Sequence, residues 1–174
     1  MKLILAPDDF LEKQVMEFDY SEQDPASVSF EMSKLMNSSG GLGLAANQVG
    51  IDAQVFVMKP IINKADISWL GTVTVINPKI IAVSEETFSE VEGCLSYPDI
   101  FLKVNRPRKI AVEYDMLTQD GQSVIHVGQT YEDIDARIFL HEYDHLFGIQ
   151  FIDRVSNLKK QMSLKKLSKN KQRK

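Results

Sequence analysis

The stretch His141-Glu142-Tyr143-Asp144-His145 constrains this chain more than any other feature of its sequence. Residues four apart lie on one face of an α-helix, so the imidazoles of His141 and His145 can converge on one metal ion. Glu142 follows the first ligand directly, where its carboxylate can take a proton from a water molecule that the metal activates. The alternative is a pair of histidines on a solvated helix. The chain has only 3 His, and two of them at this spacing, with Glu in this position, favour a metal site.

The two histidines need a third protein ligand, because catalytic zinc-type sites usually combine three protein ligands with water. In the zinc peptidases that share this helix motif, the third ligand lies downstream. Here no His follows His145, and the one acidic residue after it, Asp153, is too near in sequence to fold back easily. The third ligand is therefore expected upstream, and the single Cys94 is the favoured candidate. This argues against a zinc peptidase of the common type.

Composition excludes several classes of protein. At 174 residues and 44% hydrophobic, the chain has the length of one domain, residues 1–174, and enough apolar material for a core. A net charge of -4 argues against a nucleic-acid-binding body, so no specific DNA contact is expected. No apolar run approaches the ~20 residues of a membrane span, and the N-terminus is too soon acidic for a signal peptide. One Cys rules out an internal disulfide and fits a reducing compartment, so a cytoplasmic protein is expected.

The first half of the chain contains one clear helix followed by short strands. Asp24 before Pro25 indicates a helix start, with Asp as the N-cap, and Gly40 can end the helix. Apolar residues repeat at helical spacing between them and are expected in the core: Val28, Met32, Leu35 and Met36. Strands are expected over residues 54–59, 72–77 and 79–84, with an exposed loop at 63–71 that includes Trp69.

The second half is expected to contain a hairpin followed by the metal-binding helix. Asp120-Gly121 predicts a turn between strands at 109–117 and 122–127. His126 lies in the second strand, where we expect an ordinary strand histidine rather than a fourth ligand. Thr130 is expected to cap the following helix, which Gly148 ends. The metal ligands continue one apolar stripe of this helix and therefore predict a buried site: Ile134, Ile138, His141 and His145.

Two segments rich in small residues precede that helix. Residues 41–50 could form either a tight structural turn or an edge that binds a peptide, whereas a phosphate loop would need a Gly-Lys-Ser/Thr ending that is missing. The segment Glu92-Gly93-Cys94-Leu95-Ser96-Tyr97-Pro98 places the thiol between a glycine and a turn that is expected to end at Pro98. Glu92 has two candidate partners, Arg106 and Arg108.

The C-terminal segment, from about residue 156, is dense in Lys and Arg. Ser156 is expected to cap a last, loosely amphipathic helix with the apolar residues Leu158, Met162, Leu164 and Leu167. A solvated helix with a frayed end is one interpretation of this segment. An electrostatic contact with RNA or another anionic surface is the other.

Three motifs, taken in order, resemble those of the peptide deformylases. Residues 41–48 are similar to the family's Gly-x-Gly-x-Ala-Ala-x-Gln, and residues 92–96 to its Glu-Gly-Cys-Leu-Ser. Residues 141–145 resemble its histidine-bearing helix motif. The resemblance extends from the helix after Asp24 to about Val155. It implies an enzyme that removes the formyl group from N-formylmethionine at the start of new polypeptides. The fold that we expect is α+β, with antiparallel β-sheets around a central metal-binding helix and a helix at the C-terminus.

The resemblance also implies a role for individual residues. The carbonyl-polarising donors would be the Gln48 side chain and the Leu95 backbone N–H, and the general base would be Glu142. The substrate would lie like an added strand along Leu42, Gly43 and Gly93. The metal ligands would be Cys94, His141 and His145. The methionine pocket would be lined by Leu42, Leu95, Ile134, Ile138 and the stem of Arg137.

The cofactor and partners follow from the same resemblance. Ferrous iron is implied in the cell, with zinc or nickel as substitutes, and the partners are N-formylmethionyl peptides and nascent chains. A ribosome contact through the basic C-terminal tail is a further expectation. Two alternatives stay open: a zinc peptidase, which the missing downstream ligand opposes, and a catalytically silent formyl-peptide or metal-binding module. The intact Glu142 and Gln48 oppose the second alternative.

Overall fold

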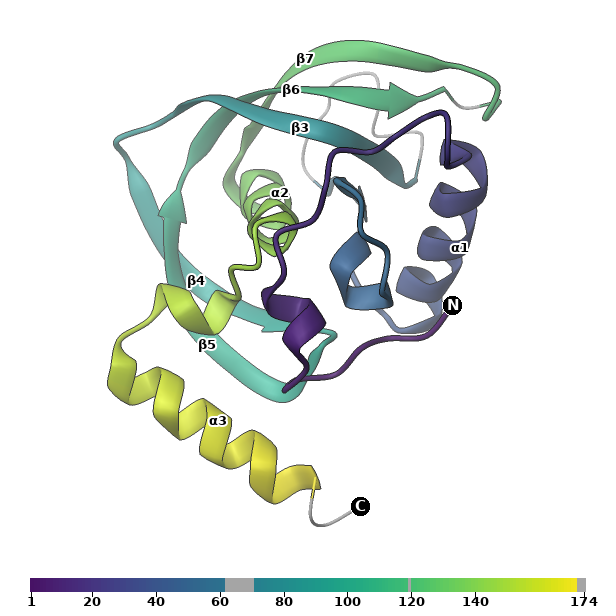
Figure 1. Cartoon of the computed structure of the whole chain (residues 1–174). Helices are drawn as coiled ribbons and strands as arrows, with labels where there is room; N and C mark the ends of the chain where they lie inside the picture. The colour runs from purple at the N-terminus through teal and green to yellow at the C-terminus, as the bar shows by residue number, and fades with distance from the viewer. Residues whose placement is uncertain (62–70, 119, 172–174) are drawn as a thin grey trace.

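The computed structural model describes residues 1–61, 71–118 and 120–171 (Figure 1). Trp69 and the expected loop at 63–71, apart from its last residue, lie outside the described residues. The elements follow in the order η1 (Asp9–Glu12), α1 (Pro25–Ser38), β1 (Gly43–Ala45), η2 (Ala46–Val49), β2 (Val55–Met58), β3 (Val73–Val83), β4 (Thr87–Cys94), β5 (Tyr97–Pro107), β6 (Lys109–Leu117), β7 (Val124–Glu132), α2 (Asp133–Leu146), η4 (Phe151–Arg154) and α3 (Asn157–Lys171).

Two antiparallel sheets surround one helix. Five strands form a sheet in the order β1-β2-β3-β6-β7, and β4 pairs with β5 in a second sheet of two strands. Figure 1 shows α2 in the centre, with the larger sheet on one side and β4 and β5 on another. The expected α+β fold, with a central helix and a C-terminal helix, is confirmed.

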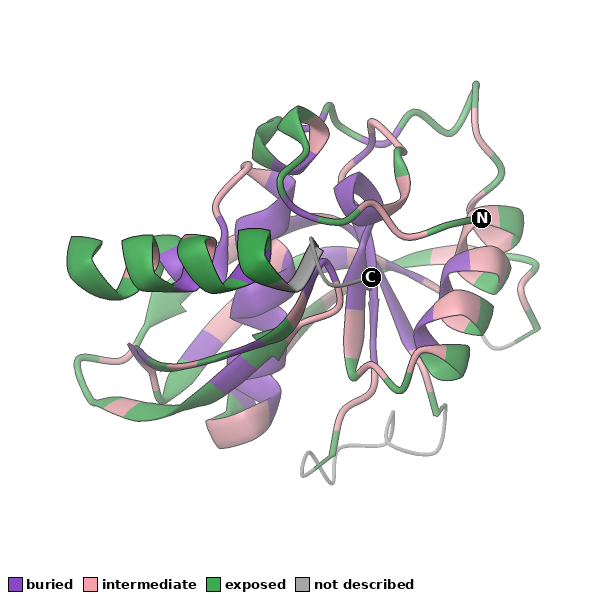
Figure 2. Ribbon diagram, turned by 90° about the horizontal axis from the view of Figure 1, so that it is seen from below, coloured by how far each residue is buried: buried purple, intermediate pink, exposed green. Residues whose placement is uncertain are grey.

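The central helix is buried on almost every side, with 11 of its 14 residues inside the protein. Its apolar side chains pack against β2, β3, β6 and β7, where Phe139 meets the ring of Phe56 edge-on at 5.1 Å between centroids. The expected stripe that leads from apolar residues to the histidines is therefore part of a largely enclosed helix. Figure 2 shows the buried residues gathered on this helix and the strands around it.

Helix α1 begins and ends as the sequence predicts. The Asp24 carboxylate accepts the backbone N–H groups of Ala26 and Ser27, both at 3.1 Å, and so caps the N-terminus. Met32 and Met36 are fully buried against the larger sheet, which confirms their place in the core. At the other end Gly40 adopts a φ of 70°, a conformation that favours glycine.

Several expected boundaries are wrong. The segments 72–77 and 79–84 form one strand, β3, with an irregularity in its pairing after Ile76. The expected turn through Pro98 is shorter, because β4 ends at Cys94 and β5 already begins at Tyr97. Thr130 does not cap α2, because β7 continues through it to Glu132 and pairs it with Ala111. A β-branched residue suits a strand as well as a cap, and here the pairing with β6 decides.

Helix α3 packs on the two-stranded sheet by a narrower face than expected. Leu167 is buried and Leu164 half-buried in a cluster with Tyr97, Val104 and Phe151. Leu158 and Met162, which were expected on the same face, are 72% and 62% exposed. In the part of the chain that the structure describes, no helix combines the length and the apolar character that crossing a membrane requires.

Candidate metal centre and active site

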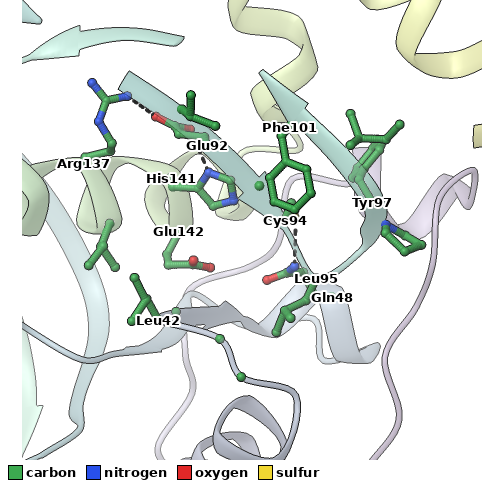
Figure 3. Close-up of a pocket in the computed structure, with 18 of the residues that line it drawn as sticks. Leu42, Gln48, Glu92, Cys94, Leu95, Tyr97, Phe101, Arg137, His141 and Glu142 are labelled. Carbon is green, nitrogen blue, oxygen red and sulfur yellow. Dashed lines mark hydrogen bonds and ion pairs between the residues drawn. The ribbon is translucent and has the colours of Figure 1, made fainter. Parts of the chain in front are cut away.

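A cavity of about 510 Å³ gathers almost all of the predicted site residues between α2, the β1 edge and β4–β5. Figure 3 shows His141 and Glu142 projecting from α2 toward Cys94, Leu95 and Gln48. His145 does not line the cavity but lies one helical turn beyond His141. The predicted residues that line it are Leu42, Gly43, Gln48, Gly93, Cys94, Leu95, Ile134, Arg137, Ile138, His141 and Glu142.

The predicted metal ligands come together beside this cavity, which Cys94 and His141 line. One potential ligand atom each from Cys94, His141 and His145 lie within 4.8 Å of one another. Cys94 Sγ is 3.3 Å from His145 Nε2. A thiolate and two imidazoles are a donor set for divalent transition metals, and three ligands leave room for a water molecule or a substrate. The residues present therefore fit a catalytic metal ion.

His126, the third histidine, lies elsewhere, on β7. Its side chain is 63% exposed, and its Nδ1 is 2.9 Å from Asp115 Oδ1 on β6. The expectation of an ordinary strand histidine is confirmed.

Glu92 orients the first histidine. His141 Nδ1–H donates to Glu92 Oε2 at 2.9 Å, which leaves His141 Nε2 to face the cavity. The same carboxylate accepts Arg106 Nε at 2.6 Å and Arg137 Nη1 at 2.5 Å. Burial alone would raise the pKa of Glu92, but the hydrogen bonds from His141 and Arg106 outweigh it and hold that pKa well below its usual range. The charged form of Glu92 is therefore favoured beside His141, a predicted metal ligand.

The sequence offered Arg106 and Arg108 as partners of Glu92, and the structure shows that the partner is Arg106. Arg108 instead pairs with Glu86 and Asp133 on the surface. Arg106 also donates to Asp144 Oδ2 at 2.8 Å, and Asp144 pairs with Arg154 of η4. Asp144 lies between the two histidines of the motif, directly before His145. Sequence reasoning could have used this position to predict a buried partner for an arginine, but it did not. The network ties β4, β5, α2 and η4 together around the predicted ligands.

Glu142 has the opposite environment. Its carboxylate is buried, and its Oε2 finds no hydrogen-bond partner among the described residues. Burial raises the pKa of Glu142 to about 7. The backbone of β1 comes so close that a Cβ built on Gly43 would lie 2.3 Å from Glu142 Oε1. Glycine at this position therefore makes room for the carboxylate beside the strand edge.

Two amides of η2 hold the site from the other side. Gln48 Oε1 accepts the Ala45 N–H at 2.8 Å, and Gln48 Nε2 donates to Cys94 Sγ at 3.3 Å and to Ser96 Oγ at 3.1 Å. These contacts fix which end of the amide faces the thiol. Asn47, which sequence reasoning missed, donates to the His145 carbonyl at 2.6 Å and anchors the end of α2 beside this predicted ligand.

The surroundings shift the pKa values of the two histidines in opposite directions. Burial and the neighbouring His141 lower the pKa of His145 well below its usual value, which favours the neutral ring. Burial also opposes the charged form of His141, but hydrogen bonds with Cys94 and Glu92 outweigh it and raise its pKa to about 10.

The Glu92→Gln variant tests whether this carboxylate positions a metal ligand. We expect its affinity for zinc to fall about 10- to 100-fold, because outer hydrogen bonds of ligating histidines contribute that much. Chelator competition measures the affinity. Glu90→Gln is the matched control, since Glu90 lies two residues earlier on β4 with its side chain exposed. Equal affinities in the two variants would contradict a role for Glu92 at the metal.

Comparison with known proteins assigns the family. The family model for polypeptide deformylase matches residues 1–161. A peptide deformylase of Thermotoga petrophila is 42% identical over 136 residues, which are 78% of this chain and 75% of that protein. A peptide deformylase of Agrobacterium fabrum is 34% identical over 96% of this chain and 94% of its own length. The crystal structure of peptide deformylase from Ehrlichia chaffeensis superposes with a TM-score of 0.85 at 31% identity, covering 99% of this chain and 97% of that one. The chain therefore belongs to the peptide deformylase family, the metal-dependent hydrolases that remove the formyl group from newly made polypeptides.

Proposed function

We propose that Cys94, His141 and His145 hold the catalytic ion and that Glu142 is the general base. The observation that carries this proposal is that three possible ligand atoms lie together, and that two of their residues line one cavity with the buried, incompletely paired carboxylate of Glu142. A divalent ion bound there would supply Lewis-acid chemistry and could lower the pKa of water from 15.7 to about 7.

The chain's own residues divide the remaining work. Glu142 takes the proton of the attacking water and delivers it to the amine nitrogen as the formyl C–N bond breaks. Gln48 Nε2 and the Leu95 N–H donate to the formyl oxygen while negative charge develops on it. Losing one donor of this kind typically costs about 100- to 1000-fold in rate. The products are formate and a polypeptide with a free amino terminus.

The substrate is proposed to lie as an extended strand between β1 and β4. β1 is the edge strand of the larger sheet, and β4 pairs with β5 alone among the described strands, so both keep a backbone edge toward the cavity. Leu42, Gly43 and Gly93 offer these edges, and strand addition is a common way of binding an extended peptide. The first side chain then enters an apolar pocket that suits methionine, lined by Leu42, Leu95, Ile134, Ile138 and the stem of Arg137.

The Glu142→Gln variant tests the assignment of the general base. We expect it to keep the metal content of the parent while turnover of a formyl-Met peptide falls about 100- to 10,000-fold, because the amide cannot accept the proton. Metal analysis and a formate-release assay on the same preparations provide the two measurements. If metal and activity are lost together, Glu142 has a structural role instead.

We propose ferrous iron as the ion in the cell, with zinc or nickel as substitutes. The family resemblance supports iron, whereas the general affinity order alone would favour zinc. Protein purified without oxygen is expected to contain close to one iron per chain and to lose activity in air, because a thiolate-bound ferrous site is open to oxidation. The zinc-loaded protein is the control and should not lose activity in air. Zinc in place of iron after anaerobic purification would overturn the assignment.

We also propose that α3 brings the enzyme to the ribosome in the cytoplasm. The single Cys94 is a free thiol, which supports a reducing compartment. The packing of Leu164 and Leu167 against β5 and η4 supports one catalytic domain that includes α3.

The outer face of α3 carries exposed lysines and is therefore suited to bind anionic RNA. Among the described residues these lysines are Lys159, Lys165, Lys166 and Lys169.

Charge reversal tests this docking better than truncation, because removing α3 would also uncover the apolar cluster around Leu167. We expect the triple change of Lys159, Lys165 and Lys169 to Glu to abolish co-sedimentation with ribosomes at low salt. Turnover of a short formyl-Met peptide should stay unchanged.

The control for the charge reversal changes three other exposed lysines, Lys2, Lys34 and Lys79, to Glu and so has the same net charge. This control should still sediment with ribosomes at low salt, and sedimentation should weaken as salt rises. Equal sedimentation of both triple variants would show that α3 is only a solubilising end.

A further inference from the structure

Two exposed apolar residues lie at the mouth of the cavity and are not used by the reaction. Val91 on β4 is 56% exposed and Phe101 on β5 is 69% exposed, yet both line the same cavity as His141 and Glu142. Figure 3 shows the Phe101 ring among the cavity-lining residues, with His141 and Cys94. Exposed apolar surface that continues a substrate cleft indicates a contact surface for part of the ligand.

The register of the small sheet places both residues on its outer face. Gly93 pairs with Phe101 and Val91 pairs with Lys103, and directly paired residues point to the same side. Residues two apart in a strand also share a side, so Val91, Gly93, Phe101 and Lys103 face outward together. Glu92 points to the other side, toward α2, where it meets Arg137 and His141.

Because Gly93 has no side chain, the Phe101 ring can pack directly on the backbone of β4. A Cβ built on Gly93 would lie 2.8 Å from Phe101 Cε1, so any larger residue would push the ring away. The ring therefore covers the outer surface of Gly93, beside the backbone edge along which the substrate is proposed to run.

An extended peptide at this edge presents its side chains alternately to the two faces. Its first side chain enters the pocket on the α2 face, between Ile134 and Ile138. Its second side chain must then lie on the outer face, beside Val91 and Phe101. This step rests on the proposed substrate strand and extends it by one residue.

We propose that Phe101, with Val91, makes this enzyme prefer an aliphatic or aromatic residue directly after the formylmethionine. Such a side chain removes its own apolar surface and part of the exposed ring from water, and an aromatic side chain can also stack on the ring. Lys103, paired with Val91 on the same face, disfavours a basic residue at this position. Phe101 is thus a specificity-determining residue of the rim and takes no part in the chemistry.

The test measures kcat/KM for the tripeptides formyl-Met-X-Ser, where X is Phe, Leu, Gly or Lys. The parent enzyme is expected to process the Phe and Leu peptides about three- to tenfold better than the Gly peptide, the range of a partly buried apolar contact. Phe101→Ala should bring these ratios close to one, because the apolar contact is lost, while the Gly peptide is still turned over. Phe101→Leu should retain part of the preference for the Leu peptide.

Phe30→Ala is the matched control, because Phe30 lies on α1 away from the cavity and is 65% exposed. It should keep the ratios of the parent. An unchanged Phe-to-Gly ratio in Phe101→Ala would overturn the proposal. So would an equal loss on all four peptides, because Phe101 would then support the architecture of the site. Formate release from the Gly peptide in every variant reports the deformylase activity itself, so a failure of this inference is distinguishable from a failure of the catalytic assignments.

Discussion

The geometry of this site depends on the hydrogen bonds that the Glu92 carboxylate accepts. This carboxylate is buried, and it accepts hydrogen bonds from Arg106, Arg137 and His141, which come from β5 and α2. A buried anion left without such partners would cost several kcal/mol, so folding brings these elements together or leaves the charge unpaired. Because Glu92 lies two residues before Cys94 on the same strand, the contact that orients His141 also sets the thiol opposite the helix.

The same arrangement leaves two backbone edges beside the cavity. β1 and β4 each pair along one edge only among the described strands, and α2 fills the space behind them. Glycine at position 43 lets Glu142 approach β1, and glycine at position 93 lets the Phe101 ring approach β4. Backbone edges, rather than side chains, therefore face the space where an extended substrate is proposed to lie, and a strand-like ligand can use both.

The sequence predicted the residues of the site better than the strands that carry them. Spacing placed His141 and His145 on one helix face, and counting ligands pointed to Cys94, because both arguments use residue chemistry alone. The choice between Arg106 and Arg108 needed the register of β5, which the sequence did not indicate: Arg106 faces inward from the strand, and Arg108 lies beyond its end. Thr130 was misplaced for a similar reason, since its strand pairing with Ala111 is a tertiary choice that local propensity does not decide.

The two buried glutamates show how one site can hold two carboxylates in different roles. Glu92 is surrounded by donors that keep its pKa low, and it stays an anion that fixes its neighbours. Glu142 lacks such donors around its Oε2, and burial raises its pKa to about 7, where a carboxylate can both accept and return a proton. A buried carboxylate oxygen without a hydrogen-bond partner lowers the free energy of unfolding. The charge that is fixed by hydrogen bonds thus contacts His141, and the carboxylate with a raised pKa lines the cavity beside it.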